Sequence, residues 1–417
     1  MMRRCSSRWH LSGLGLGACP GRCLGLIAVT AGALSAQMLM PGGMFRLFTS
    51  DAAILESQEV RKDLPCTVSP VKPFLGFDLK FHSGYSVSVP LHELAGDGNM
   101  LTMVFRVTPD AHPDEPVYLS QRVAVPNIAD DAKGEAALQG EFDVGLGKYH
   151  VDWLMRDRSE HVCSSNWDIE ASLPQKDREM ALDIGRSVIQ PPDEQPFRQE
   201  PPVERVHEGK PLNVKVMINF APQNAYSAAM QPLDMNALIS ILRNIAREPR
   251  IGRFSVVAFN MQEQRVLYRQ QSESQIDFPA LGEALHSLSL GTVDYHKLGQ
   301  KHSDSEFLTN LITTEIGNDK ETPDAVIIAG PKVMLDDSIP QEPLKQIGDL
   351  HFPLFYMNYN LNPQATPWRD AIGSAVKYLK GAEYTITRPR DLFFVWSEIM
   401  GRIVKSRVER TASTSSP

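Results

Sequence analysis

The residues best suited to metal chemistry lie close together near position 300. His296, His302 and Asp304 form a His-x5-His-x-Asp pattern within a polar stretch. Imidazole nitrogens and a carboxylate oxygen are common zinc ligands, and a zinc ion with an open position supports hydrolysis. The spacing matches no standard zinc pattern, however, and solvated loop histidines are the simpler interpretation. An exported zinc-dependent or other hydrolase that uses this loop is therefore the alternative hypothesis.

Other catalytic motifs are absent from the sequence. There is no Gly-x-Ser-x-Gly elbow, no His-Glu-x-x-His pair and no Gly-x4-Gly-Lys-Ser/Thr loop. The acid pairs Asp130-Asp131 and Asp336-Asp337 stand in polar, turn-like stretches, where solvated carboxylates are expected. We therefore predict a non-enzymatic protein with no catalytic residue, no cofactor and no resident metal.

The second half of the chain, residues 212–404, alternates apolar strands with amphipathic helices. Such strands predict a mostly parallel sheet covered on both faces, an α/β doubly wound, Rossmann-type domain. Asp234 is expected to cap the first helix. The expected strands are 214–219, 253–260, 264–270, 324–330, 352–360 and 382–387, and the expected helices are 234–249, 278–288, 305–316, 341–350, 367–381 and 390–406.

Residues 63–175 follow a different, two-residue period. Six or seven short strands separated by Gly, Pro, Asn and Asp predict an N-terminal all-β, Ig-like sandwich. Tyr149, Val151 and Trp153 are expected to face its core. The expected strands are 77–91, 101–109, 116–126, 135–145, 148–157 and 165–173.

Two segments lack the apolar content of a folded element. Residues 187–211 are rich in proline and charge, which indicates an extended, semi-rigid linker. Residues 405–417 end in RTASTSSP, which predicts a disordered tail.

The N-terminus has the layout of a secretory signal peptide. Four arginines precede an apolar run of about 14 residues that ends in small residues at Ala36, too short for a span of about 20. We predict a leader over residues 1–36 and a periplasmic or secreted chain with no membrane span in its mature form. Leu16 to Cys19 resembles a lipobox, so lipidation of Cys19 is the alternative, although the longer apolar run follows that cysteine.

Charge and cysteine usage fit export. Without the leader, 38 basic residues face 50 acidic ones, a formal charge of −12, and no basic stripe favours nucleic acid. Only Cys66 and Cys163 remain, which predicts one disulfide. A redox pair is the less favoured alternative, because reactive pairs usually stand as Cys-x-x-Cys.

The order of elements over residues 212–404 resembles the von Willebrand factor A domain, in the variant form of exported acidobacterial proteins. Four local patterns carry the resemblance: 214–219 as the first strand, Gly291-Thr292 as the Gly-Thr loop, 324–331 as the fourth strand, and Asp391-Leu392 before the last helix. The resemblance implies a divalent-ion site at the carboxyl edge of the sheet, built from Asp-x-Ser-x-Ser, a threonine and a fourth-strand aspartate.

The expected metal ligands have been replaced in this chain. The loop reads Asn219-Phe220-Ala221-Pro222-Gln223, and Ala329-Gly330-Pro331 stands where the fourth-strand aspartate would fall. Mg²⁺ needs at least one or two carboxylates, so the resemblance implies a degenerate, metal-free site.

The loops at that edge are the predicted binding surface. Ligands of doubly wound sheets bind at the carboxyl ends of the strands. We therefore predict a protein-binding or adhesion-type module whose partner is a protein or a cell-envelope component; ordinary polar loops on a structural envelope protein are the alternative. The predicted rim residues are Asn219, Phe220, Gln223, Thr292, Asp294, Tyr295 and Asn358.

Overall fold

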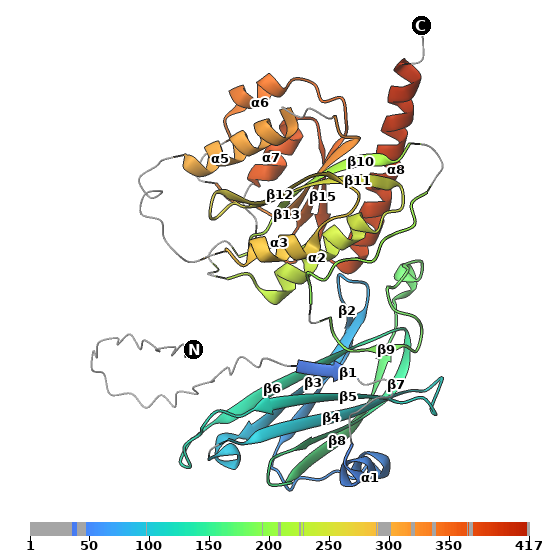
Figure 1. The fold of residues 1–417 in the computed structure, drawn as a ribbon, viewed down its shortest axis with the longest axis vertical. Helices are drawn as coiled ribbons and strands as arrows, with labels where there is room; N and C mark the ends of the chain where they lie inside the picture. Colours follow the sequence, from blue (N-terminus) through green and yellow to red (C-terminus); the bar gives the residue numbers. More distant parts are fainter. Residues whose placement is uncertain are drawn as a thin grey trace, which may run out of the picture.

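The computed structural model describes most of the chain as two bodies, one above the other in Figure 1. Several β-sheets and a set of helices make up the fold. The predicted leader lies outside the described residues except for Ala36, and Cys19 does too. The described residues are 36–39, 47–96, 98–193, 195–206, 210–224, 227, 229–288, 290, 302–317, 322–335, 339–364, 366 and 370–414.

Two antiparallel sheets form the lower body (Figure 1). One has the order β1-β5-β4-β7-β8, with β1 (Ala36–Leu39), β5 (Val117–Ala124), β4 (Met100–Pro109), β7 (Gly147–Arg156) and β8 (Val162–Ala171). The other has the order β2-β3-β6-β9, with β2 (Thr67–Leu75), β3 (Phe81–Pro90), β6 (Glu135–Val144) and β9 (Ile189–Gln190). Helix α1 (Thr49–Ser57) and the short 3-10 turns η1 (Leu91–Leu94) and η2 (Gln175–Asp177) complete this body.

The two sheets share one aromatic core. Tyr85 and Phe142 come from one sheet, Phe105 and Trp153 from the other, and all four are buried. The Tyr85 and Trp153 rings lie 5.1 Å apart between centroids. Face-to-face packing of this kind buries the inward residues of both sheets. The prediction that alternate residues of β7 face the core is confirmed, because Trp153 and its neighbours two and four residues earlier are buried.

Cys66 and Cys163 form the predicted disulfide, with their Cα atoms 6.3 Å apart. Cys66 directly precedes β2 and Cys163 lies in β8, so the bond links the two sheets. The Cα separation lies within the usual range for a disulfide.

Removing this disulfide is expected to destabilise the chain strongly. A sequence separation of 97 residues predicts a loss of about 4–5 kcal/mol for Cys66→Ser with Cys163→Ser, because the open unfolded chain gains conformational entropy. Urea unfolding of both chains would measure the loss. A loss below about 1 kcal/mol would contradict this estimate.

The upper body contains one six-stranded mixed sheet. Its order is β12-β11-β10-β13-β14-β15, and all neighbours are parallel except the edge pair β11 and β12. This is a doubly wound arrangement. The chain first adds β11 and β12 on one side of β10 and then adds β13, β14 and β15 on its other side. The strands are β10 (Leu212–Asn219), β11 (Ile251–Asn260), β12 (Arg265–Glu273), β13 (Ala325–Pro331), β14 (Leu354–Tyr359) and β15 (Ala382–Ile386).

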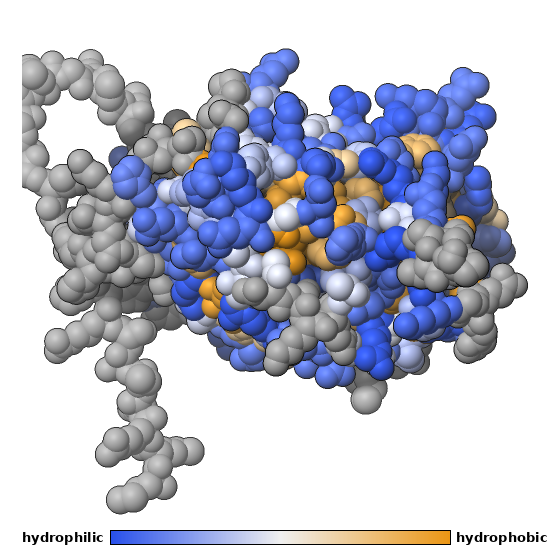
Figure 2. Space-filling view, turned by 90° about the horizontal axis from the view of Figure 1, so that it is seen from above, coloured by the Kyte–Doolittle hydropathy of each residue, from blue (hydrophilic) through white to orange (hydrophobic). Residues whose placement is uncertain are grey.

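Helices cover both faces of this sheet. One core packs α2 (Pro232–Ala246), α3 (Phe278–Leu285) and α8 (Pro389–Thr414) against one face. A second core packs α5 (Ser303–Ile312), η3 (Thr313–Gly317), α6 (Gln341–Ile347) and α7 (Ala371–Tyr378) against the other. Strands β13 and β14 are buried along their whole length, because both of their faces are covered. Seen from above, the surface is mainly hydrophilic, with a smaller apolar area near the middle (Figure 2).

The C-terminal tail is helical as far as Thr414, so the prediction of a disordered tail over 405–417 is wrong for 405–414. Arg407 and Arg410 reach Asp324, just before β13, with closest N–O distances of 3.7 and 3.1 Å. These ion pairs hold the polar end of α8 against the sheet, an interaction between distant residues that local composition does not show. No helix in the described part of the chain is long and apolar enough to cross a membrane.

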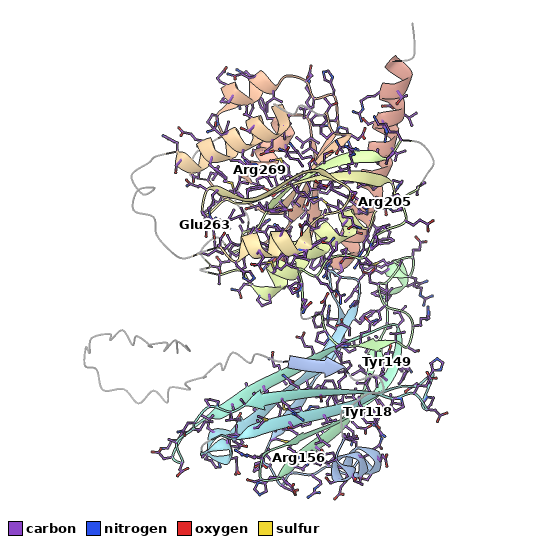
Figure 3. All side chains as sticks on the ribbon, in the orientation of Figure 1. Tyr118, Tyr149, Arg156, Arg205, Glu263 and Arg269 are labelled. Atoms are coloured by element: carbon purple, nitrogen blue, oxygen red, sulfur yellow. A yellow bond between two sulfur atoms is a disulfide. The ribbon has the colours of Figure 1, made fainter. Side chains whose placement is uncertain are left out.

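The proline-rich segment is extended, but it is bound to the upper body along much of its length. Glu200 is buried and pairs with Arg243 at 2.9 Å and Arg247 at 2.7 Å on α2. Arg205, labelled beside the upper body in Figure 3, donates to the backbone carbonyl of Glu248 at 2.8 Å. Phe197 packs against Gly282 of α3, where a Cβ atom would lie 2.7 Å from its ring. The segment is therefore a docked strap as well as a connection.

Candidate functional site

The carboxyl edge of the mixed sheet brings three predicted positions into one row. Asn219 ends β10, Gly330 lies beside it on β13, and Asn358 is paired with Gly330 on β14. Gly330 has φ +148°, and a Cβ atom there would lie 2.7 Å from the Cβ of Asn219. An aspartate therefore has no room at Gly330, and β13 itself carries no carboxylate.

Asn219, Phe220 and Asn358 are buried, so they do not form an exposed rim, and their role in binding stays a prediction. Asn219 Oδ1 accepts a hydrogen bond from the Met261 N–H at 3.1 Å. Asn260 Nδ2 donates to the Phe220 carbonyl at 2.5 Å. These bonds join the ends of β10 and β11. A reading of strand ends alone does not anticipate this burial.

Hydrogen-bonding groups without partners concentrate at this same edge. Twelve buried side-chain atoms in the described part of the chain make no hydrogen bond, although those of Asp143, Asp177 and Arg243 lie in ion pairs. Four of them belong to residues at the carboxyl edge: Asn219 Nδ2, Gln223 Nε2, Asn358 Oδ1 and Asp370 Oδ2. A buried polar atom without a partner costs about 1–3 kcal/mol, so such a group points to strain, an ordered water or a ligand.

Asp370 was not predicted as a site residue, and it is the one acid of this group. It caps α7, and its Oδ1 accepts from the N–H groups of Ile372 and Val333, each at 3.1 Å. Burial raises the pKa of Asp370 to about 6, although the Val333 N–H and the nearby Tyr356 hydroxyl act in the opposite direction. That hydroxyl nevertheless lacks hydrogen-bonding geometry toward Oδ2.

Asp370 reaches the end of β13 from a different element. Val333 directly follows β13, so the hydrogen bond from its N–H places the Asp370 carboxyl at this strand end. A sequence signal existed, because an aspartate before the apolar residues Ala371 and Ile372 is a typical N-cap. The expected helix began at 367, four residues before the start of α7, so Asp370 was not identified as the cap. Residues 367–369 lie outside the described part.

Asp234 has a different role from the one predicted. It lies in the first turn of α2, whose N-cap is Gln231, so its prediction as the cap is wrong. Its Oδ2 accepts from the Gln223 N–H at 3.3 Å, and its Oδ1 accepts from the Tyr359 hydroxyl at 3.1 Å. Burial raises the pKa of Asp234. The carboxyl therefore ties the loop after β10 to the end of β14.

Several predicted residues cannot be placed. Thr292, Asp294, Tyr295 and His296 lie outside the described residues. His302 is described, with φ 72°, immediately before α5.

The zinc hypothesis gains no geometric support from the described ligands. Asp304 Oδ1 accepts from the Ser305 N–H at 3.1 Å, a bond within the first turn of α5. Among the described residues, the one group of three potential metal ligands is Asp78, His82 and Asp143, in the other body.

That group forms an ion-pair network. His82 Nε2 lies 3.0 Å from Asp78 Oδ1, and His82 Nδ1 lies 2.8 Å from Asp143 Oδ1. Lys80 Nζ lies 3.2 Å from the other oxygen of Asp143, which is fully buried. Burial alone would lower the pKa of His82, but the two aspartates outweigh it and raise the pKa to about 10.

The network stabilises the hairpin that contacts the upper body. Phe77, at the tip between β2 and β3, packs edge-on against Tyr359 with centroids 5.9 Å apart. Arg390 at the start of α8 pairs with Asp177 of the lower body at 3.0 Å. Between the bodies lies a cleft of about 270 Å³, with charged residues of both bodies and of the strap in its lining. Most of these charges already have partners, so the cleft is part of the junction.

Comparisons with known proteins leave the family open. No protein-family model matches the chain, and no curated protein does. Among solved structures, the Northeast Structural Genomics Consortium target SoR45 is 9% identical, with a TM-score of 0.17, over 31% of this chain and 99% of its own. A glycosyl hydrolase family 2 member from Bacteroides cellulosilyticus is 10% identical, with a TM-score of 0.18, and a Bacteroides uniformis β-glucuronidase is 12% identical, with a TM-score of 0.17. The match spans 38% of the length of each of these two enzymes. It includes 77% of this chain for the first enzyme and 76% for the second. Similarities this weak support no functional argument.

Proposed function

We propose that the protein is an exported, non-enzymatic binding module whose site is the carboxyl edge of the mixed sheet. The observation that carries the proposal is the set of four unpartnered polar atoms on Asn219, Gln223, Asn358 and Asp370. Two are donors and two are acceptors, so they suit a polar group that both donates and accepts hydrogen bonds. The partner is a protein or cell-envelope component that inserts such a group between the loops.

Binding at this edge is proposed to be independent of metal. The ends of β10 and β13 carry Asn219 and Gly330, and neither supplies an anionic ligand. Asp370 is the one carboxylate in the unpartnered group, and Mg²⁺ sites in proteins use carboxylates together with several other oxygens at tight octahedral geometry. The two amide nitrogens of the group are hydrogen-bond donors and cannot bind a cation.

The architecture of the two bodies is a second argument for a binding module. The mixed sheet has an antiparallel edge pair, as the resemblance to von Willebrand factor A domains predicts. The two-sheet body is proposed to be Ig-like, with a disulfide between its sheets. Export is proposed from the leader pattern at the N-terminus and is compatible with that disulfide.

Capture from an envelope extract of the source cells tests the proposal. The immobilised full chain from residue 37 is expected to retain a partner in the presence of EDTA. Gln223→Ala and Asp370→Asn are each expected to reduce the retained amount about tenfold or more, the effect of losing one or two buried hydrogen bonds. Asn236→Ala, an exposed change on α2, is the matched control and should retain as much as the unchanged chain.

Two outcomes would overturn the proposal. One is equal retention by all four chains, which would leave the edge without a binding role. The other is stoichiometric zinc in the purified protein that is lost in His302→Ala, since this would favour the hydrolase.

A further inference from the structure

Helix α8 carries an outward-facing stripe along the side opposite its packed face. The stripe consists of Phe394, Ser397, Gly401, Val404 and Val408, and all five are exposed. Their spacing of three, four, three and four residues is the heptad spacing of helices that pair. The residues of α8 that pack against the sheet are Leu392, Trp396, Ile399, Met400 and Ile403.

Three apolar side chains of the stripe are exposed to solvent. Phe394 and Val404 are each 37% exposed and Val408 is 64% exposed. Figure 1 shows the C-terminal end of α8 extending beyond the rest of the upper body. This part of the helix is therefore accessible to another molecule.

Gly401 stands in the middle of the stripe without a packing reason inside the chain. A Cβ atom there would meet nothing within 4 Å. A glycine inside a helix costs about 0.5–1 kcal/mol relative to alanine. A missing side chain on an open face allows the backbone of a second helix to approach closely, because the distance between helices depends on the side chains at the contact.

We propose that the stripe pairs with the stripe of a second copy of this chain, in antiparallel orientation around a two-fold axis near Gly401. Small residues then oppose larger ones: Gly401 faces Val404 of the second copy, and Ser397 faces its Val408. The same surface serves both copies, as in most homodimers.

Charge decides the orientation. Glu398 and Lys405 flank the stripe on the same side and are exposed. An antiparallel pair places Glu398 of each copy near Lys405 of the other, whereas in a parallel pair these two positions lie on opposite sides of the seam and do not meet. Glu398 accepts from the Tyr384 hydroxyl at 2.6 Å, which positions it at the helix surface. No ion pair of Lys405 occurs within the described residues.

Sedimentation velocity of the full chain from residue 37 tests this pairing. Because the stripe is short, we expect a weak, reversible dimer whose fraction rises as the protein concentration increases from about 1 to 500 µM. Val404→Asp should raise the dissociation constant about a hundredfold by burying a charge. Lys405→Glu should raise it about fivefold to tenfold, and adding Glu398→Lys to the same chain should restore it. Lys345→Glu, on α6, is the matched charge-reversal control and should dimerise normally.

The outcomes separate the proposal from its alternatives. A monomer at every concentration, or a dimer unaffected by Val404→Asp, would overturn it. Failure of the double charge reversal to restore what Lys405→Glu loses would rule out the antiparallel orientation. Circular dichroism of each variant tests whether unfolding causes a loss of dimer. We expect every variant to stay folded, because all these positions are exposed.

Discussion

Asp143→Asn is expected to lower the free energy of unfolding by about 3–5 kcal/mol at pH 6, the usual cost of breaking a buried ion pair. The Asp143 carboxylate is fully buried and holds both His82 at 2.8 Å and Lys80 at 3.2 Å. Without its charge, two cations remain beside an uncharged amide. Urea unfolding monitored by the fluorescence of the buried Trp153 would measure the loss.

The pH dependence of this loss has a defined sign. The pKa of His82 is raised to about 10 in the folded chain, against about 6.5 unfolded. A raised pKa contributes stability that is fully present below pH 6.5 and is lost as the pH approaches 10. The difference between the unchanged chain and Asp143→Asn should therefore shrink from pH 6 to pH 10.

The matched control is another aspartate that contacts a histidine. Asp168 lies 2.6 Å from His150, but its side chain is 85% exposed. Asp168→Asn should cost less than about 1 kcal/mol, because exposed pairs contribute little. Equal losses for the two variants would mean that burial does not give the Asp143 network its strength.

Asp370→Asn is expected to stabilise the chain at pH 7.5 by on the order of 2–3 kcal/mol while it weakens binding. The pKa of Asp370 is raised to about 6, against about 3.9 unfolded. Its contribution to stability is thus full below about pH 4 and is lost as the pH rises through 6. Asparagine is an equally good N-cap and carries no charge to bury. Thermal unfolding at pH 7.5 and at pH 4 would show a gain only at the higher pH.

Asp391 provides the control for this substitution. It lies near the start of α8, and its Oδ2 accepts from the N–H groups of Thr387 and Arg388 and from the Thr387 hydroxyl. Because every donor suits an anion, Asp391→Asn should destabilise by about 1 kcal/mol at pH 7.5. A loss of stability in Asp370→Asn at pH 7.5 would show that its carboxylate is structural and would remove the reason to assign it to a ligand. Residues that form a binding site often lower the stability of the folded protein.

The order of strands and helices could be predicted, because period and apolar content are local properties. Strands such as β13, buried from Ala325 to Pro331, read as apolar runs in the sequence. The disulfide could be predicted by elimination, since Cys66 and Cys163 are the two cysteines that remain after the leader.

The features that could not be predicted depend on contacts between distant residues. The helical end of α8 is held by Asp324, more than eighty positions earlier, and the strap is held by arginines of α2. Asn219 and Asn358 are buried, with Asn219 bonded to the Met261 N–H and Asn358 to the Glu383 carboxylate, and no local pattern specifies these contacts. Asp370 reaches the site from a helix start that the sequence placed four residues too early.

Photo-crosslinking from the two ends of one strand tests the central claim most directly. A crosslinking residue would replace the exposed Met334, just after β13 at the carboxyl edge, or the exposed Thr322, just before β13 at the opposite edge. Both full chains would be irradiated in source-cell envelope extract with EDTA. We predict a partner adduct from position 334 that is absent from position 322 and is lost when Asp370→Asn is added. Adducts from both positions alike, or an adduct that disappears with EDTA, would contradict a metal-independent site at this edge.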